Sequence, residues 1–241
     1  MKIDILTLIP GVFQNVFNES VLGSALEKQI LEIGFHSIRD FGEGRHRVVD
    51  DTAFGGGPGM VLKPGPLIQA IRALRENGEV APVIGLTPQG VKLSQKLLKE
   101  LSHKPRLMLV CGRYEGFDER IRREFDLEVS IGDYVLSGGE IAAMVFVDSM
   151  ARLIPGTIGD QASVEQDSFF NGPLDHPQYT RPAVWESLPV PQVLSEGNHE
   201  SINLWRKARS LKKTAVRRPD LFCRLNLDGK EKNLLQTCFA D

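Results

Sequence analysis

Residues 109–141 read LVCGRYEGFDERIRREFDLEVSIGDYVLSGGEI and contain two glycine-rich turns, at 112–116 and 132–139. Each turn follows a short apolar or β-branched run that is typical of a strand in a parallel sheet. In open α/β sheets, ligands bind in the loops at the carboxyl ends of the strands. Glycine lets a backbone approach a ligand closely because it has no Cβ. Either turn alone fits an ordinary glycine turn, but the pair predicts one ligand held mainly by backbone groups.

Strands and helices are predicted to alternate along the first 153 residues. The predicted strands lie at 3–9, 35–41, 80–86, 106–111 and 127–131. The predicted helices lie at 10–17, 20–30 (capped by Ser20), 66–76, 91–101, 117–125 and 140–153. This alternation is typical of the α/β class, in which helices cover both faces of a parallel sheet. The last helix is apolar almost all round, so we expect it to be buried, partly by a second subunit.

Composition restricts the function classes. The chain has 241 residues, 25% of them charged, and a net charge of -2, so any nucleic-acid surface must be local. Three cysteines without paired spacing argue against a disulfide framework or zinc site and favour a reducing cytoplasm. The N-terminus is not typical of a signal peptide, and the longest apolar run is far short of the roughly 20 residues that span a membrane. The histidines show no paired spacing, so no metal site is predicted.

A glycine-rich segment at 54–60, FGGGPGM, follows a charged stretch that includes Arg45 and Arg47. It is not a phosphate-binding P-loop, because no Gly-Lys-Ser/Thr follows. A flexible surface loop and a loop that folds over a ligand or nucleic acid fit it about equally, and the two arginines favour an anionic ligand.

The composition changes at Pro155-Gly156. Residues 157–174 are polar and aperiodic, which is typical of a linker. An amphipathic helix is predicted at 200–213, and residues 206–224 carry eight basic side chains against one acidic side chain, Asp220. A solvated helix face is the usual explanation of such a run. A surface that contacts a phosphate backbone is the alternative, and we favour it here.

Five motifs together resemble one family. They are VCGRYEGFDERI (110–121), SIGDYVLSGGEIAAMVFVDSMARLIPG (130–156), FGGGPGM (54–60), EQDSF (165–169) and DHPQYTRP (175–182). From residue 1 to about residue 221 the chain resembles the bacterial tRNA guanine-N1 methyltransferases, the TrmD family of the SPOUT superfamily.

The resemblance implies an α/β fold with a SPOUT-type parallel sheet and a deep trefoil knot, a rare exception to the rule that folds are not knotted. It implies a knotted cofactor domain at 1–158, a flexible linker at 159–174 and a small all-α tRNA-binding domain at 175–241. The cofactor would be S-adenosylmethionine, the partners tRNA and a second copy of the chain, and the location cytoplasmic. The product would be 1-methylguanine at the guanine 3′ of the anticodon. Magnesium is also suggested, without assignable ligands.

The resemblance also implies the site residues. Asp167 matches the family's general base and Arg152 its guanine-binding arginine, and Glu115 would lie near the positively charged end of the cofactor. A departure is Gly85, where relatives carry an aromatic residue. The implied cofactor-binding residues are Thr87, Pro88, Gln89, Gly90, Gly112, Arg113, Tyr114, Glu115, Gly116, Ile131, Gly132, Asp133, Tyr134, Val135, Leu136, Ser137, Gly138 and Gly139.

Other interpretations remain open. Without the resemblance, Asp167 is explained as a linker residue that caps a helix, and Arg152 as a partner of a helix dipole. The same fold could serve as a non-catalytic RNA-binding module, or as a SPOUT-type methyltransferase acting on another RNA. A small-molecule hydrolase using Glu115 and Asp133 is a more distant alternative, which predicts neither cofactor binding nor tRNA dependence.

Overall fold

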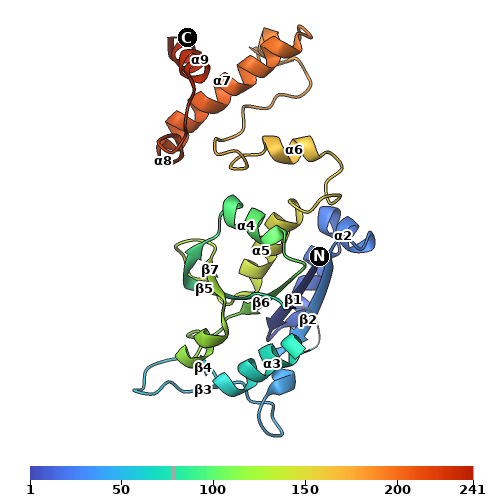
Figure 1. Ribbon diagram of the computed structural model, residues 1–241, viewed down its shortest axis with the longest axis vertical. Helices are drawn as coiled ribbons and strands as arrows, with labels where there is room; N and C mark the ends of the chain where they lie inside the picture. Colours follow the sequence, from blue (N-terminus) through green and yellow to red (C-terminus); the bar gives the residue numbers. More distant parts are fainter. Residues whose placement is uncertain (77–79, 241) are drawn as a thin grey trace. The chain divides into compact units, whose positions relative to one another are not determined.

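The computed structural model describes residues 1–76 and 80–240. The chain divides into two compact units, Met1–Gln161 and Ala162–Asp241, and each is considered by itself (Figure 1).

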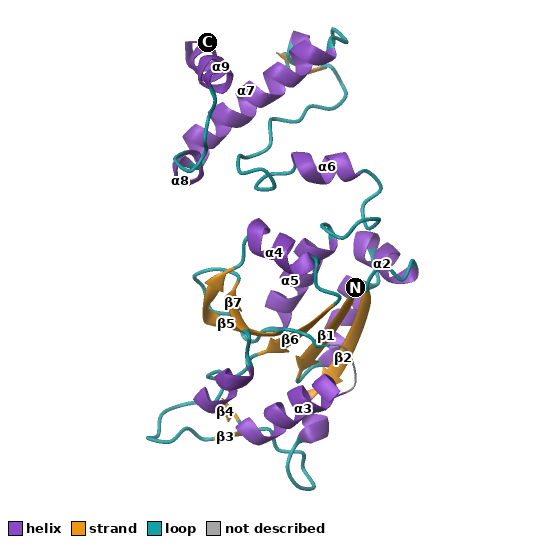
Figure 2. Ribbon diagram, viewed as in Figure 1, coloured by secondary structure: helices purple, strands orange, loops and turns teal. Residues whose placement is uncertain are grey.

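A five-stranded parallel sheet forms the centre of the first unit (Figure 2). Its order is β2-β1-β6-β5-β7. The strands are β1 (Lys2–Thr7), β2 (Glu32–Ser37), β5 (Val83–Lys92), β6 (Arg106–Cys111) and β7 (Leu127–Ser130). Strand β6 lies in the middle and all of its residues are buried, as its apolar sequence RLMLVC predicts. The predicted α/β class with a parallel sheet is confirmed.

Helices cover both faces of the sheet. Successive strand residues point to opposite faces, so Met108 and Val110 face one side and Leu107 and Leu109 the other. Met108 and Val110 share a buried cluster with Leu67 and other residues of α3. On the other face, α5 packs against β6 and α4. The helices of this unit are α1 (Gln14–Phe17), α2 (Ser20–Glu27), α3 (Pro64–Glu76), α4 (Gln95–Ser102) and α5 (Glu140–Ala151), with 3-10 turns η1 (Pro10–Phe13), η2 (Ile38–Phe41) and η3 (Glu119–Glu124) and the short antiparallel pair β3 (Asp50–Asp51) and β4 (Val61–Leu62).

Several predicted boundaries were wrong near the N-terminus. The strand predicted at 35–41 begins at Glu32 and ends at Ser37, because the chain turns at η2 to bury Ile38. Ser20 does not cap α2: the capping position is Glu19, and Ser20 itself has a φ of 56°. The helix predicted at 117–125 is the 3-10 turn η3.

The turn predicted at 87–90 lies inside β5. The strand continues to Lys92, and its pairing with β7 shifts register between Leu86 and Val91. Gly90 permits this irregularity, because a Cβ there would lie 2.3 Å from the backbone nitrogen of Val129. The following helix therefore begins at Gln95 rather than at residue 91, and Ser94 caps it by accepting a hydrogen bond from the Leu97 amide at 3.3 Å.

The second unit is built around the long helix α7 (His199–Arg217). Asn198 caps this helix by accepting hydrogen bonds from the amides of Glu200 and Ser201. Its buried face includes Ala208, Leu211 and Thr214. The other elements are α6 (Gln161–Gln166), β8 (Val184–Trp185), β9 (Leu188–Pro189), η4 (Gln192–Leu194), α8 (Pro219–Phe222) and α9 (Gly229–Ala240).

The stretch 159–174, expected as a flexible linker, includes α6 and a turn that hydrogen bonds fix. Asn171 donates from its side chain to the carbonyl of Glu165 at 2.9 Å. The Leu174 amide donates to Oγ1 of Thr214 on α7 at 2.9 Å. Within residues 1–76 and 80–240, no helix is both long and apolar enough to cross a membrane.

Candidate active site

A cavity of about 320 Å³ lies at the carboxyl ends of β6 and β7, beside the irregular part of β5. Three loops form its wall: the irregular part of β5 and the two glycine turns that follow β6 and β7. The lining residues are Leu86, Thr87, Pro88, Gln89, Gly112, Arg113, Tyr114, Glu115, Gly116, Phe117, Glu119, Arg122, Val129, Ser130, Ile131, Gly132, Tyr134, Val135, Leu136, Ser137, Gly138, Gly139 and Ala142. The structure thus brings together every residue expected to bind the cofactor, except Gly90 and Asp133.

Those two residues have other surroundings. Gly90 packs directly on the backbone of β7. Asp133 is exposed and forms an ion pair with Lys92 at 2.6 Å, outside the cavity lining.

The two glycine turns are bonded to each other. The amide of Gly139 donates to the carbonyl of Gly112 at 2.7 Å, and Arg113 and Gly138 form an isolated β-bridge. A Cβ at Gly139 would lie 2.8 Å from Cα of Cys111, which is closer than Cβ atoms approach in proteins. Glycine at 139 is therefore required for the two turns to form a single wall.

The buried carboxylate of Glu140 connects this wall to the sheet. Glu140, at the start of α5, accepts a hydrogen bond from the Thr7 hydroxyl at 2.8 Å. Nε of Arg113 lies 3.3 Å from the same carboxylate oxygen. Burial raises the pKa of the neighbouring Cys111 thiol well above its usual value. The thiol therefore stays neutral and is a poor nucleophile.

A charged cluster forms the rim. Arg122 donates to the side chains of Glu128 and Gln89, and at 2.7 Å to Glu119. Its hydrogen bond to Glu128 raises the pKa of Arg122, so the guanidinium is permanently charged. Glu119 and Arg122 line the cavity but were missed by the sequence analysis. The only sequence signal was the high charge of 117–125, which did not indicate that Arg122 would pair with Gln89 and Glu128.

The glycine-rich segment 54–60 ends at the edge of the cavity. The Glu115 amide donates to the carbonyl of Met60 at 2.9 Å. A Cβ on Gly59 would lie 2.2 Å from Oε1 of Glu115. The segment therefore packs against a cavity residue at its end, while Phe54 at its start is fully exposed.

Arg152 and Asp167, the expected catalytic residues, belong to different units. Arg152 follows the last turn of α5, and its amide donates to the carbonyl of Asp148 at 3.5 Å. Asp167 lies in the turn after α6, where its carbonyl accepts a hydrogen bond from the Phe170 amide at 3.3 Å.

Gly85, where the resemblance led us to expect an aromatic residue, lies against the ring of Phe125. A Cβ at this position would lie 2.5 Å from Cε2 of Phe125. Phe125 therefore fills the space that an aromatic side chain at position 85 would need.

The residues present fit a small ligand held by backbone groups. A Cβ on Gly112 would lie 3.0 Å from the Phe117 ring, and one on Gly138 would lie 2.4 Å from Oε2 of Glu140. The volume is at the lower end of the roughly 300–1,000 Å³ of small-molecule sites. Among the described residues, no cluster of three or more His, Cys, Asp or Glu side chains is placed to hold a metal ion.

The fold and the cavity define an α/β protein with a candidate ligand site at the carboxyl edge of a parallel sheet. Two glycine turns that are hydrogen-bonded to each other form the wall of this site. Comparison with known proteins identifies the family. Residues 1–224 match the family model described as tRNA (Guanine-1)-methyltransferase TrmD, and the chain belongs to this family.

Relatives named tRNA (guanine-N(1)-)-methyltransferase are similar over nearly the whole chain. The relative from Carboxydothermus hydrogenoformans is 51% identical, covering 100% of this chain and 95% of its own length. The relative from Dehalococcoides mccartyi is 47% identical, covering 100% and 98%. That from Geobacillus kaustophilus is 48% identical, covering 98% and 97%.

Proposed function

We propose that this protein transfers a methyl group from S-adenosylmethionine to N1 of the guanine immediately 3′ of the anticodon (tRNA position 37), forming 1-methylguanine. The family match and the relatives' names support the reaction. The observation that carries the proposal is the hydrogen bond between Gly139 and Gly112, which joins two glycine turns into the wall of one cavity of about 320 Å³.

The cavity loops have the binding role. S-adenosylmethionine supplies an electrophilic methyl group on a positively charged sulfur. Backbone groups of the turns at 112–116 and 131–139, with Thr87, Pro88 and Gln89, bind and orient the cofactor. Glu115 places a negative charge near its cationic end. Fixed loops favour transfer because they hold the reacting atoms in line.

Asp167 and Arg152 have the roles of base and charge stabiliser. The guanine N1 carries a proton and is a poor nucleophile until that proton leaves. Asp167 accepts it as a general base within hydrogen-bond reach. Negative charge then develops on the guanine carbonyl oxygen, where Arg152 stabilises it. Loss of one such donor costs about 3–4 kcal/mol of transition-state stabilisation.

A homodimer is part of the proposal. Ile141 and Val145 lie one turn apart on α5 and are 55% and 40% exposed, although the helix is apolar almost all round. Helix α5 contacts η1, where Val12 is also exposed. A second subunit would cover these exposed apolar side chains and that of Val16, so that each active site is built from both chains.

The remaining parts of the proposal concern fold and partners. The domain at 1–158 is proposed to contain a deep trefoil knot on the basis of the family match. Residues 175–241, after the linker 159–174, act as a helical tRNA-binding domain through the basic side chains of residues 206–224, on α7 and just after it. The reaction takes place in the cytoplasm, and magnesium assists it without assigned protein ligands.

Methyl transfer from labelled S-adenosylmethionine to an unmodified tRNA transcript tests this function. The wild type is expected to form 1-methylguanine after the anticodon, and Asp167→Ala to lose it while still binding the cofactor. Glu165→Gln removes a nearby carboxylate on α6 and serves as the matched control, with activity retained. Near-full activity of Asp167→Ala would refute the assignment of the base. Methylation of another RNA or another atom, or no methylation at all, would refute the proposed reaction.

A further inference from the structure

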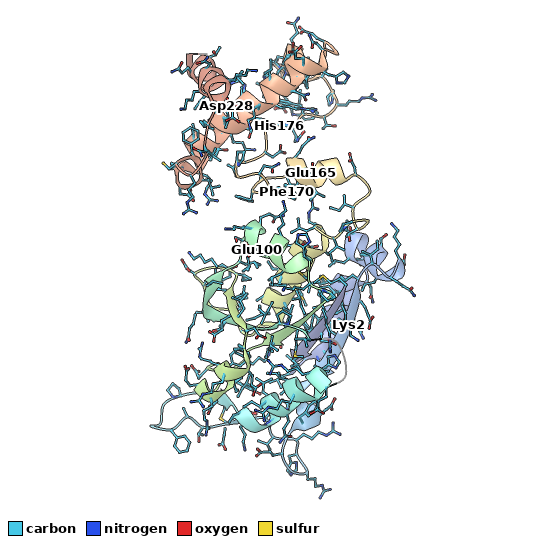
Figure 3. The ribbon with its side chains drawn as sticks, viewed as in Figure 1. Lys2, Glu100, Glu165, Phe170, His176 and Asp228 are labelled. Carbon is cyan, nitrogen blue, oxygen red and sulfur yellow. The ribbon has the colours of Figure 1, made fainter. Side chains whose placement is uncertain are left out.

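A second cavity, of about 620 Å³, lies within the second unit. Its walls are the segment 176–183, the region around η4 and the first half of α7, and Figure 3 shows His176 beside this helix. The charged or chargeable side chains that line it are Arg181, Arg206 and His176. None of the described residues lining this cavity is Asp or Glu. The cavity therefore favours an anionic ligand.

Hydrogen bonds fix the wall before any ligand binds. The Leu174 carbonyl accepts a hydrogen bond from the Ser210 hydroxyl at 2.5 Å. Nζ of Lys213 donates to the carbonyl of Asp175 at 3.0 Å. The Asp175 carboxylate, which lies next to the wall, accepts from the amide of His176 at 2.7 Å and from the side chain of Gln178 at 3.0 Å. The negative charge of Asp175 is thus stabilised by donors from residues 176 and 178 of the same segment.

Aromatic rings gather around Trp205 in the same cavity. The Tyr179 ring lies 6.2 Å and the His176 ring 6.5 Å from it, centroid to centroid. The Arg209 guanidinium lies 5.8 Å from the Trp205 ring, at a cation–π distance. Tyr179 is half exposed, so part of its ring is accessible to a ligand. Aromatic side chains of this kind stack with unpaired bases.

Arg206 supplies an unsatisfied donor. Its Nε is buried and has no hydrogen-bond partner among the described residues. A buried charged donor is unfavourable unless an acceptor pairs with it. A phosphate is the natural acceptor, because a guanidinium can donate two parallel hydrogen bonds to its oxygens.

We propose that this cavity binds one unstacked nucleotide of the substrate tRNA, with its base against Tyr179 and Trp205 and its phosphate on Arg206 and Arg181. This inference rests on the proposed function. Base-stacking rings combined with cations and a lining without carboxylates match single-stranded RNA, whereas a duplex is too wide to enter. The cavity contributes to tRNA affinity and is lined by residues of the second unit alone, none of them in the cofactor loops, so its loss should affect binding and leave the chemical step unchanged.

Steady-state kinetics of Arg206→Gln and Arg181→Gln test this. Each is expected to raise KM for tRNA about tenfold or more, the effect of losing a charged hydrogen bond to phosphate, with kcat within about twofold of the wild type. Lys230→Gln is the matched control, because it removes one exposed positive charge from α9, outside both the cavity and the basic stretch 206–224. Unchanged KM in both cavity variants, or an equal rise in the control, would overturn the proposal. A loss confined to kcat would do the same.

Fluorescence gives a direct readout that is independent of turnover. The chain has two tryptophans, so Trp185→Phe leaves Trp205 as the reporter. Unmodified tRNA is expected to quench Trp205 in this background, and Arg206→Gln to shift the titration to higher tRNA concentration. Thermal unfolding of each variant checks that the second unit stays folded. If Arg206→Gln unfolds, Arg181→Gln still tests the site, because the exposed Arg181 side chain is not needed for packing.

The outcomes separate the two proposals. Methylation by the wild type with no quenching of Trp205 by tRNA would refute the nucleotide site and leave the enzyme function intact. Quenching by an acidic peptide at the same concentration, but not by tRNA, would assign the cavity to a protein partner and also refute it. Absence of both methylation and tRNA binding would refute both proposals.

Discussion

The hydroxyl of Thr7 donates a hydrogen bond of 2.8 Å to Oε1 of Glu140, 133 residues further along the chain. Both side chains are buried. The contact joins the carboxyl end of β1 to the first turn of α5, and Arg113 approaches the same carboxylate from the cavity side. Glu140 therefore connects strand β1 of the sheet to the wall of the candidate cofactor site.

Glu140→Gln should weaken both the fold and the site. The amide keeps the size of the side chain but removes the charge that pairs with Arg113. The free energy of unfolding is expected to fall by about 1–3 kcal/mol, because a buried charged donor loses its partner. Urea unfolding measures this, and calorimetry with S-adenosylmethionine should show weaker binding. Glu32→Gln, which removes an exposed ion pair with Lys2, should cost less than about 1 kcal/mol. Equal effects of the two changes would contradict the role of Glu140.

Gly139→Ala should separate the two glycine turns. Its Cβ would lie 2.8 Å from Cα of Cys111 and 2.9 Å from the amide nitrogen of Gly112, and both are backbone atoms that a rotamer change cannot relieve. We expect cofactor affinity to drop at least about tenfold, a loss of roughly 1.4 kcal/mol in binding free energy. Gly11→Ala is the control, because a Cβ there has no described atom within 4 Å. Unaltered cofactor binding in Gly139→Ala would show that the contact between the turns is not needed.

Much of the sheet could be predicted from sequence because local patterns determine it. Strand β6 was predicted at 106–111 and is found there, since an unbroken apolar run next to a glycine turn leaves few alternatives. Strand β5 was predicted to end at Leu86 because Pro88 and Gly90 are typical of turns. It continues because β7 accommodates a register shift, and that pairing is not encoded locally.

In the candidate sites, too, local motifs could be predicted from sequence, whereas contacts between distant elements could not. The loops that line the first cavity carry recognisable glycine motifs. Arg122 carries no motif and reaches the cavity through its partners Gln89 and Glu128, which lie on other elements. The cavity around Arg206 was missed for a similar reason. Ser210 and Lys213 on α7 donate hydrogen bonds to the carbonyls of Leu174 and Asp175, just before the segment that lines the cavity, and sequence spacing does not reveal these bonds.

Asp4→Asn should change the dependence of stability on pH. Burial by itself raises the pKa of Asp4, but hydrogen bonds from His36 (2.7 Å) and Arg106 (2.7 Å) outweigh it and hold the pKa below its usual value. A carboxyl whose pKa is lowered by folding contributes stability above its unfolded pKa of about 3.9. This contribution is lost as the pH falls through the lowered pKa.

The Asn variant should therefore lose about 3–5 kcal/mol of unfolding free energy at neutral pH, because it leaves Arg106 buried beside an uncharged partner. The deficit relative to the wild type should shrink as the pH falls below about 4. Urea unfolding between pH 7 and pH 3 measures both effects. Asp40→Asn, which removes an exposed ion pair with Arg47, should cost less than about 1 kcal/mol at any pH. A deficit that is constant with pH would mean that the Asp4 charge is not the cause.

Val145→Lys should disrupt the proposed dimer. Val145 and Ile141 are exposed on a helix whose other face is buried in the core, so a lysine is tolerated by the isolated subunit but not inside an apolar interface. Light scattering after size exclusion should show a shift from dimer to monomer mass, with methyl transfer lost if each active site needs both chains. Val80→Lys adds the same charge at a 93% exposed position and should leave both the mass and the activity unchanged. A Val145→Lys protein that stays dimeric and active would move the interface away from α5, whereas a monomer with full activity would show that one chain completes the site.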